Sequence, residues 1–237
     1  MKSFTILIKE SFDIYKQKIK PILILLAIFV VVTIILTVLL GGGLFLSLLL
    51  AKTSGVSADT FKALAFSPAL FLFILAYAFW FTFIGLSFLI LAIKPAETRL
   101  KEIFQETWRK FGQYLWLVIL TSFFIILSSL FFIIPGIIVA IYLSFYPYTF
   151  IIEGEKGMSA LKRSWALVKG NWWKVFGRLI LLNIVFGTIV ILLSSINDLL
   201  GSVFQSLSMP FGIIFAYLIY LELKRSKEIQ APTPIQI

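Results

Sequence analysis

The residue types most often used in catalysis are scarce in this chain, which contains no histidine and no cysteine. A thiol nucleophile, a disulfide, an imidazole base and a thiolate or imidazole metal site are therefore excluded. Glu153 and Glu155 are expected to be solvated charges of a loop or of a helix N-terminus, where neither carboxylate would act as a general acid or base. We predict no catalytic residue, no metal site and no cofactor, and we expect the protein not to be an enzyme.

Basic and aromatic side chains form the first group of candidate functional residues. Between residues 161 and 172 the apolar residues recur at helical spacing, and the basic residues lie off that face. Such a helix can lie in the headgroup layer of a membrane and bind anionic lipids. The candidate headgroup-binding residues are Lys162, Arg163, Lys169, Trp165 and Trp172. The positive-inside rule is a second explanation for the basic residues, because it alone requires them beside membrane spans.

Polar residues inside the apolar segments form the second group. Asn183, Tyr146 and Tyr148 could line a path for a solute. The alternative is that they make hydrogen bonds between neighbouring helices. No apolar segment carries a charge near its centre, which argues against a proton-coupled or ion-coupled transporter but not against a passive pore.

The overall composition indicates the class of protein to which these residues belong. The chain has 237 residues, of which 60% are hydrophobic and 14% are charged. Charged residues make up about 25% of an ordinary soluble domain. Most of this chain therefore has too few charged side chains to be stable in contact with water, and the composition predicts an integral membrane protein.

Stretches without charged residues are long enough for six membrane spans, since one crossing needs roughly 20 residues. The stretch between Lys110 and Glu153 holds two spans, because Pro135-Gly136 favours a turn near its middle. The fourth span contains Pro147 and could be kinked or re-entrant. The predicted spans are 22–40, 69–93, 115–134, 137–152, 175–195 and 203–221, in a single membrane domain of residues 1–222 with a short cytoplasmic tail at 223–237.

The basic residues predict the orientation. With six spans, 19 of the 21 lysines and arginines lie on the side of the N-terminus, and Lys52 and Lys62 lie on the other side. By the positive-inside rule, both termini are cytoplasmic. The first apolar run is longer than the apolar core of a signal peptide, so we expect it to remain as an anchor.

Three amphipathic segments precede spans one, three and five. They run over residues 4–19, 100–111 and 161–172, and each is expected to form a helix at the cytoplasmic membrane surface. The predicted fold class is therefore all-α: a polytopic membrane protein with six transmembrane helices and three cytoplasmic interfacial amphipathic helices.

Three short motifs resemble a known group of proteins. They are Ile134-Pro135-Gly136, Ala160-Leu161-Lys162-Arg163-Ser164-Trp165 and Lys169-Gly170-Asn171-Trp172-Trp173. They resemble the six-span glycerophosphoryl diester phosphodiesterase membrane domain and related uncharacterised integral membrane families of bacteria and archaea. The resemblance implies a module in the cytoplasmic (inner) membrane of a prokaryote. Some members of the group carry a soluble phosphodiesterase barrel that uses histidine, and this chain has no histidine, so the resemblance does not imply that activity.

Two functions fit these features. The first is a non-enzymatic membrane module that interacts with anionic lipids of the phospholipid bilayer or with a membrane protein partner. The alternative is a small transporter or permease for an apolar or amphipathic solute. A lipid-modifying enzyme has the least support. Nucleic acid is not an expected partner, because the net charge of +10 comes from residues that border membrane spans. Gly187 and Gly212 make a homo-oligomer conceivable.

Overall fold

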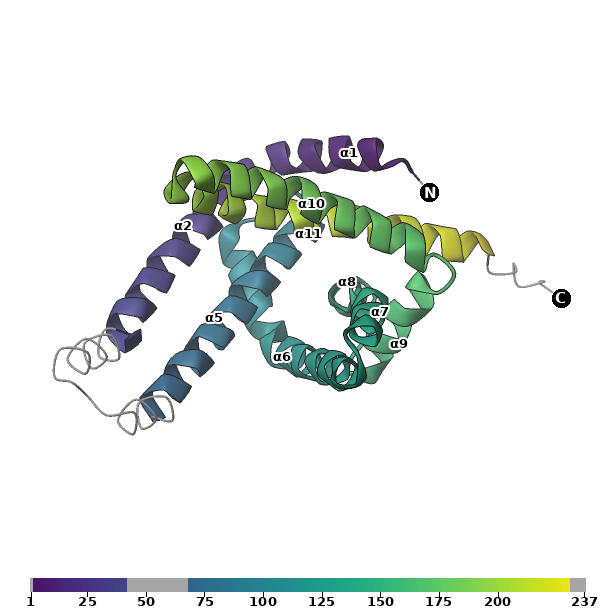
Figure 1. Cartoon of the computed structure of the whole chain (residues 1–237), viewed down its shortest axis with the longest axis horizontal. Coiled ribbons are helices and arrows are strands. Elements are labelled where there is room, and N and C mark those ends of the chain that lie inside the picture. The colour runs from purple at the N-terminus through teal and green to yellow at the C-terminus, as the bar shows by residue number, and fades with distance from the viewer. Residues whose placement is uncertain (1, 42–67, 231–237) are drawn as a thin grey trace. The chain divides into compact units, whose positions relative to one another are not determined.

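The computed structural model describes residues 2–41 and 68–230, and every regular element within these ranges is helical (Figure 1). Lys52 and Lys62, which are predicted to lie on the outer side, and the end of the tail lie outside the described residues. The helices are α1 (Phe4–Gln17), α2 (Ile19–Leu36), a short π-helical turn (Thr37–Gly41), α5 (Pro68–Ile93), α6 (Leu100–Phe131), α7 (Ile133–Leu143), α8 (Tyr146–Ile152), α9 (Met158–Val168), α10 (Trp172–Ile196) and α11 (Asp198–Gln230).

Within the described residues, six helical segments are long and apolar enough to cross a membrane. They are Ile19–Leu39, Leu70–Ile93, Leu100–Leu130, Ile133–Glu153, Trp172–Ile196 and Asp198–Ile229. Each overlaps one predicted span. Within the described residues, the predictions of an all-helical fold and of six apolar segments of membrane-spanning length are confirmed, as expected for a multi-pass membrane protein.

The structure consists of two compact units, Leu23–Gly85 and the remainder of the chain. In the smaller unit, α2 packs against α5 through Trp80. The Trp80 ring stacks on Phe29 with ring centres 6.5 Å apart, and its Nε1–H donates to Thr33 at 3.2 Å. One turn further on, the hydroxyls of Thr37 and Tyr77 are 2.8 Å apart. These polar contacts join two otherwise apolar helices.

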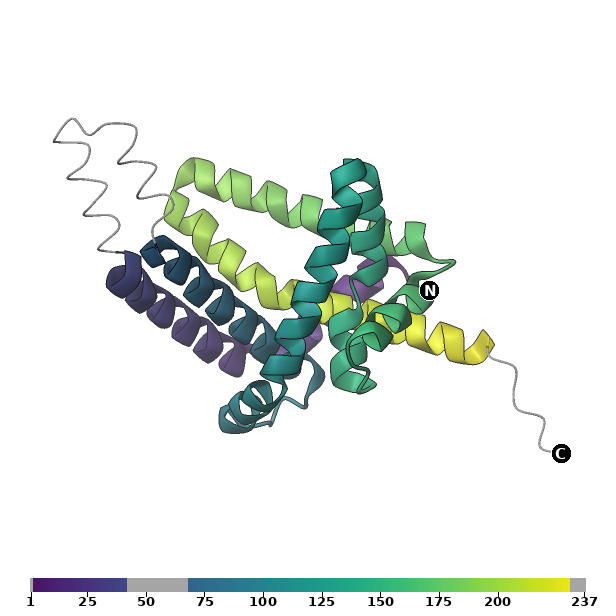
Figure 2. The same cartoon turned by 90° about the horizontal axis from the view of Figure 1, so that it is seen from below.

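The larger unit, Met1–Ile22 with Leu86–Ile237, has its core around the second half of α11. The buried residues of α11 include Ile214, Phe215, Ile219, Tyr220 and Leu223. Helix α10 lies beside α11 in both views (Figures 1 and 2). Helix α1 also packs on α11: the rings of Phe4 and Phe215 meet edge to face, and the Tyr15 hydroxyl donates to the Leu207 carbonyl at 3.0 Å.

Two hairpins in this unit turn in the same way. A single extended residue separates the helices in each: Phe132 between α6 and α7, and Asn197 between α10 and α11. The helices then approach closely at a glycine. A Cβ on Gly136 would lie 1.9 Å from the Ser129 hydroxyl, and a Cβ on Gly201 would lie 1.9 Å from that of Ser194.

Several predicted boundaries differ from the structure. The chain turns at Phe132, and Pro135-Gly136 lies in the first turn of α7, because proline is tolerated at the start of a helix. No separate helix precedes the third span: α6 is continuous from Leu100, because Gly112 alone does not end a helix. Gly170, by contrast, has a φ of +88° and follows the end of α9.

Candidate functional site

Helix α9, which carries most of the predicted lipid-binding residues, is attached to the break between α7 and α8. The Ser164 hydroxyl donates to the Tyr142 carbonyl at 2.8 Å and accepts the Phe145 N–H at 3.1 Å. The Thr149 hydroxyl donates to the Ala160 carbonyl at 3.1 Å. Ser164 and Thr149 are fully buried, so these bonds are shielded from solvent.

Pro147 explains why these bonds are needed. Proline has no N–H and cannot continue the hydrogen-bond ladder of α7. The fourth span is therefore broken, and Pro147 lies in the first turn of α8. Ser164 supplies the partners that the broken backbone lacks. The sequence gave no direct sign of this role, although Ser164 is part of a motif that supports the family resemblance.

Trp165 forms a stacked pair with Tyr142 of α7. The two ring centres are 3.9 Å apart and the planes differ by 12°. A stack this close needs the backbones of α7 and α9 at fixed positions. The Ser164 hydrogen bonds to the same part of α7 hold the two helices in place. We call these two rings the aromatic pair.

Each residue of the aromatic pair lines a different apolar groove. The wide groove, of about 930 Å³, is formed by α7, the start of α10 and the residues before it; its lining is Ile134, Ile137, Ile138, Tyr142, Gly170, Asn171, Trp172, Trp173, Lys174 and Phe176. The narrow groove, of about 280 Å³, is formed by α6, α7 and α9; its lining is Phe124, Ser128, Val139, Leu143, Met158, Leu161, Lys162 and Trp165. Each groove therefore contains one lysine.

The predicted headgroup residues divide among these surfaces. Lys162 and Trp165 line the narrow groove, and Trp172 lines the wide groove. The Trp172 ring stacks on Phe176 with centres 4.9 Å apart. Lys174, exposed in the wide groove, was not predicted; its place directly after Trp172-Trp173 was the available signal. Lys169 is exposed and lines neither groove.

Arg163 is engaged within the protein. Its Nε–H donates to the Glu153 carboxylate at 2.6 Å, and this bond raises the pKa of Arg163. The Tyr220 hydroxyl donates to the other Glu153 oxygen at 2.6 Å, and the Lys224 ammonium is 3.7 Å from it. The expectation that Glu153 is a solvated loop charge is wrong, because its side chain is only 12% exposed between α9 and α11.

The intramembrane candidates do not form one site. The Tyr148 hydroxyl is buried and donates to the Ile213 carbonyl at 2.7 Å, and Tyr146 stacks on Tyr114. The Asn183 amide donates to the Leu179 carbonyl of its own helix at 2.8 Å. Asn183 also lines a third groove, of about 490 Å³, between α10 and α11. Gln205, Ser208, Gly187 and Gly212 line the same groove.

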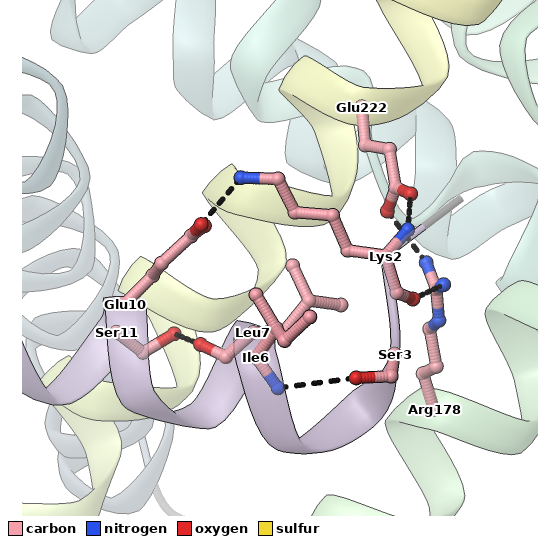
Figure 3. Close-up of polar contacts among 8 residues, drawn as sticks. All are labelled: Lys2, Ser3, Ile6, Leu7, Glu10, Ser11, Arg178 and Glu222. Atoms are coloured by element: carbon pink, nitrogen blue, oxygen red, sulfur yellow. Dashed lines mark hydrogen bonds and ion pairs between the residues drawn. The ribbon is translucent and has the colours of Figure 1, made fainter.

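The start of the chain is held by an ion pair between α10 and α11 (Figure 3). Arg178 donates to Glu222 at 2.7 Å and also to the Lys2 carbonyl, while the Lys2 backbone N–H donates to Glu222. The Lys2 ammonium pairs with Glu10 of α1. Arg178 and Glu222 are both almost buried, so they anchor the segment before α1.

Lys18 is another basic residue with a role inside the protein that the sequence did not predict. It lies between α1 and α2, and its ammonium donates to the carbonyls of Leu91, Ala92 and Lys94 at 2.9, 2.7 and 2.6 Å. These carbonyls end α5, where a cation is favourable. Burial lowers the pKa of Lys18 to about 8. Lys18 is therefore not available to a lipid headgroup.

Comparison with known proteins gives one match. No curated protein and no solved structure matches the chain. The profile of a family described as Domain of unknown function (DUF7847) matches residues 109–221, a range that contains both grooves and the aromatic pair. The match agrees with the expected uncharacterised family and gives no support to the narrower resemblance to the glycerophosphoryl diester phosphodiesterase membrane domain. Residues 109–221 of this multi-pass chain are thus similar to a family whose function is unknown.

Proposed function

We propose that this chain is a non-enzymatic module of the cytoplasmic membrane of a prokaryote and that it binds anionic lipid beside α7, α9 and the start of α10. The observation that carries the proposal is the presence of one exposed lysine in each of two apolar grooves, Lys162 in the narrow one and Lys174 in the wide one. A groove of this kind suits an acyl chain, and each cation near a membrane surface contributes about 1 kcal/mol to binding anionic lipid.

The aromatic residues support the same location. Trp165 and Trp172 line the two grooves, and indole rings favour the boundary between apolar and hydrated layers. In this proposal α1 and α9 lie at the cytoplasmic surface, together with the first turns of α6. Arg163 and Lys18 hold helices together and do not contact the lipid. A membrane protein partner could bind the same surface only by displacing the lipid.

Lipid binding is tested by native mass spectrometry of the purified protein, titrated with phosphatidylglycerol and with phosphatidylcholine. The double variant Lys162→Gln, Lys174→Gln is expected to lose most of its preference for phosphatidylglycerol. The double variant Lys9→Gln, Lys101→Gln is the matched control, since it removes the same charge from exposed residues outside the grooves. Equal losses in both variants, or no preference in the unmodified protein, would contradict the proposal.

We also propose that both termini are cytoplasmic, as the distribution of 19 basic residues on one side indicates. The absence of cysteine makes this simple to test, because single cysteines can be labelled without background. In intact cells, an impermeant maleimide should label Lys52→Cys and should not label Ser3→Cys or Ser226→Cys. Labelling of either terminal variant would contradict the proposed orientation.

A transporter for an amphipathic solute is the second candidate function, and the third groove favours it. Asn183, Gln205 and Ser208 give this groove a more polar lining than the other two. Flux of the amphipathic dye rhodamine into proteoliposomes should then exceed that into empty liposomes and should change in Asn183→Leu. Flux equal to that of empty liposomes would show that the protein does not transport amphipathic solutes of this kind.

A further inference from the structure

The aromatic pair connects the linings of the two grooves. Tyr142 lines the wide groove and Trp165 lines the narrow groove, and their ring centres are 3.9 Å apart. The two rings in contact therefore belong to the linings of different grooves. Each ring uses one face in the stack, which leaves the rest of its surface to the groove that it lines.

Helix α7 also contributes residues to both linings. Ile134, Ile138 and Tyr142, at intervals of one helical turn, face the wide groove, while Val139 and Leu143 face the narrow one. The grooves thus follow different sides of the same helix. Near its C-terminal end the consecutive residues Tyr142 and Leu143 line one groove each, beside the aromatic pair.

The charged residues that line the two grooves are basic. Lys162 lines the narrow groove and Lys174 lines the wide one, and both are exposed. None of the described residues that line either groove is acidic. An occupant that fits has two apolar arms, joined at one end, and carries a negative charge near that end.

We propose that one anionic phospholipid with two acyl chains occupies both grooves, with one chain on each side of the aromatic pair. Its glycerol backbone lies over Tyr142 and Trp165, and its phosphate lies between Lys162 and Lys174. This inference rests on the proposed lipid-binding function and adds to it the number of lipids and of chains. A lipid that only surrounds the protein would contact these surfaces without a fixed stoichiometry.

The test fills one groove at a time in the full chain. Ile137→Trp enlarges a residue that lines the wide groove, and Ser128→Phe enlarges one that lines the narrow groove. Ile126→Trp is the matched control, because Ile126 is exposed on α6 and lines neither groove. If Ser128→Phe does not fold, Val139→Phe fills the same groove from α7.

Native mass spectrometry then measures the binding of phosphatidylglycerol with two oleoyl chains and of its one-chain lyso form. We expect one two-chain lipid per protein and a loss of about tenfold or more in affinity when either groove is filled, which corresponds to about 1.4 kcal/mol. The lyso form should bind more weakly than the two-chain lipid. The control should bind as the unmodified protein does.

Two results would overturn the inference and leave the proposed function intact. One is two lipids per protein, with each filling variant removing only one of them. The other is a single lipid whose binding depends on Lys162 and Lys174 but is unchanged by either filling variant. A protein that binds no phosphatidylglycerol in preference to phosphatidylcholine would instead contradict the proposed function itself.

Discussion

Arg163 and Glu153 form an ion pair with an Nε to Oε2 distance of 2.6 Å, and the other oxygen of the same carboxylate accepts the hydroxyl of Tyr220 at 2.6 Å. One carboxylate thus connects the end of α8 with α9 and α11. The connection holds α9 in place, and α9 supplies Lys162 and Trp165 to the narrow groove.

The first prediction separates the adjacent basic residues of α9. Arg163→Gln should lower the free energy of unfolding by about 1–2 kcal/mol, because it removes a charged hydrogen bond that is partly screened by solvent. Lys162→Gln should leave stability nearly unchanged, since this side chain is exposed. Thermal unfolding in detergent measures both. Equal stability of the two variants would show that the ion pair contributes nothing.

The second prediction concerns the break between α7 and α8. Ser164→Ala should destabilise the protein by about 1–3 kcal/mol, because the Phe145 N–H and the Tyr142 carbonyl both lose a buried partner. Ser206→Ala is the control, as this hydroxyl donates to the Ser202 carbonyl of its own helix. Unfolding temperatures give the comparison, and a larger loss in the control would contradict the role of Ser164.

The third prediction concerns the turn between α6 and α7. Gly136→Ala should destabilise the protein by about 1–3 kcal/mol, because the added methyl group would lie 1.9 Å from the Ser129 hydroxyl and 3.0 Å from its Cβ. Gly112→Ala on α6 meets no atom within 4 Å and should stabilise the helix by up to about 1 kcal/mol. Opposite signs of the two shifts in unfolding temperature are expected; shifts of the same sign would contradict the close approach.

The fourth prediction is a pH dependence that arises from Lys18. Because burial lowers its pKa from 10.5 to about 8, the unfolded chain binds more protons than the folded one between these two values. Stability therefore rises with pH across this window through Lys18, and it does not change through Lys18 below the window.

The measurement compares unmodified protein with Lys18→Met, which cannot titrate at this position. The difference in unfolding temperature between them should increase in favour of the unmodified protein from pH 8 to pH 10.5. Lys20→Met, which alters an exposed side chain nearby, should show no such trend. A difference that falls over the same range would have the wrong sign for a buried ammonium group.

The fold was largely predictable because burial in lipid leaves a strong mark on composition. Uncharged stretches long enough for one or two crossings of roughly 20 residues each predicted all six membrane-length helices. The exact turns were less predictable. Pro135-Gly136 marked the right region, yet the reversal occurs at Phe132, because proline fits the first turn of a helix as well as a turn.

The candidate site was predictable only in part. Lys162, Trp165 and Trp172 were identified because an amphipathic pattern shows which residues face an interface. The internal roles of Ser164, Glu153 and Lys18 were not predicted, and Glu153 was wrongly expected to be solvated, since a serine, a glutamate and a lysine beside a membrane span are ordinary when seen in the sequence alone. Their partners Tyr142, Tyr220 and Leu91 are distant in sequence, by 73 positions for Lys18 and Leu91.

The sequence by itself determined the class of protein, the six membrane-length segments and the absence of histidine and cysteine chemistry, because hydrophobicity and residue type are local properties. Only the tertiary structure decided that Arg163 and Lys18 make hydrogen bonds within the protein while Lys162 and Lys174 are exposed. The physical reason is that a charge is neutralised by whatever group folding brings within a few ångströms of it, and spacing along the chain does not contain that information.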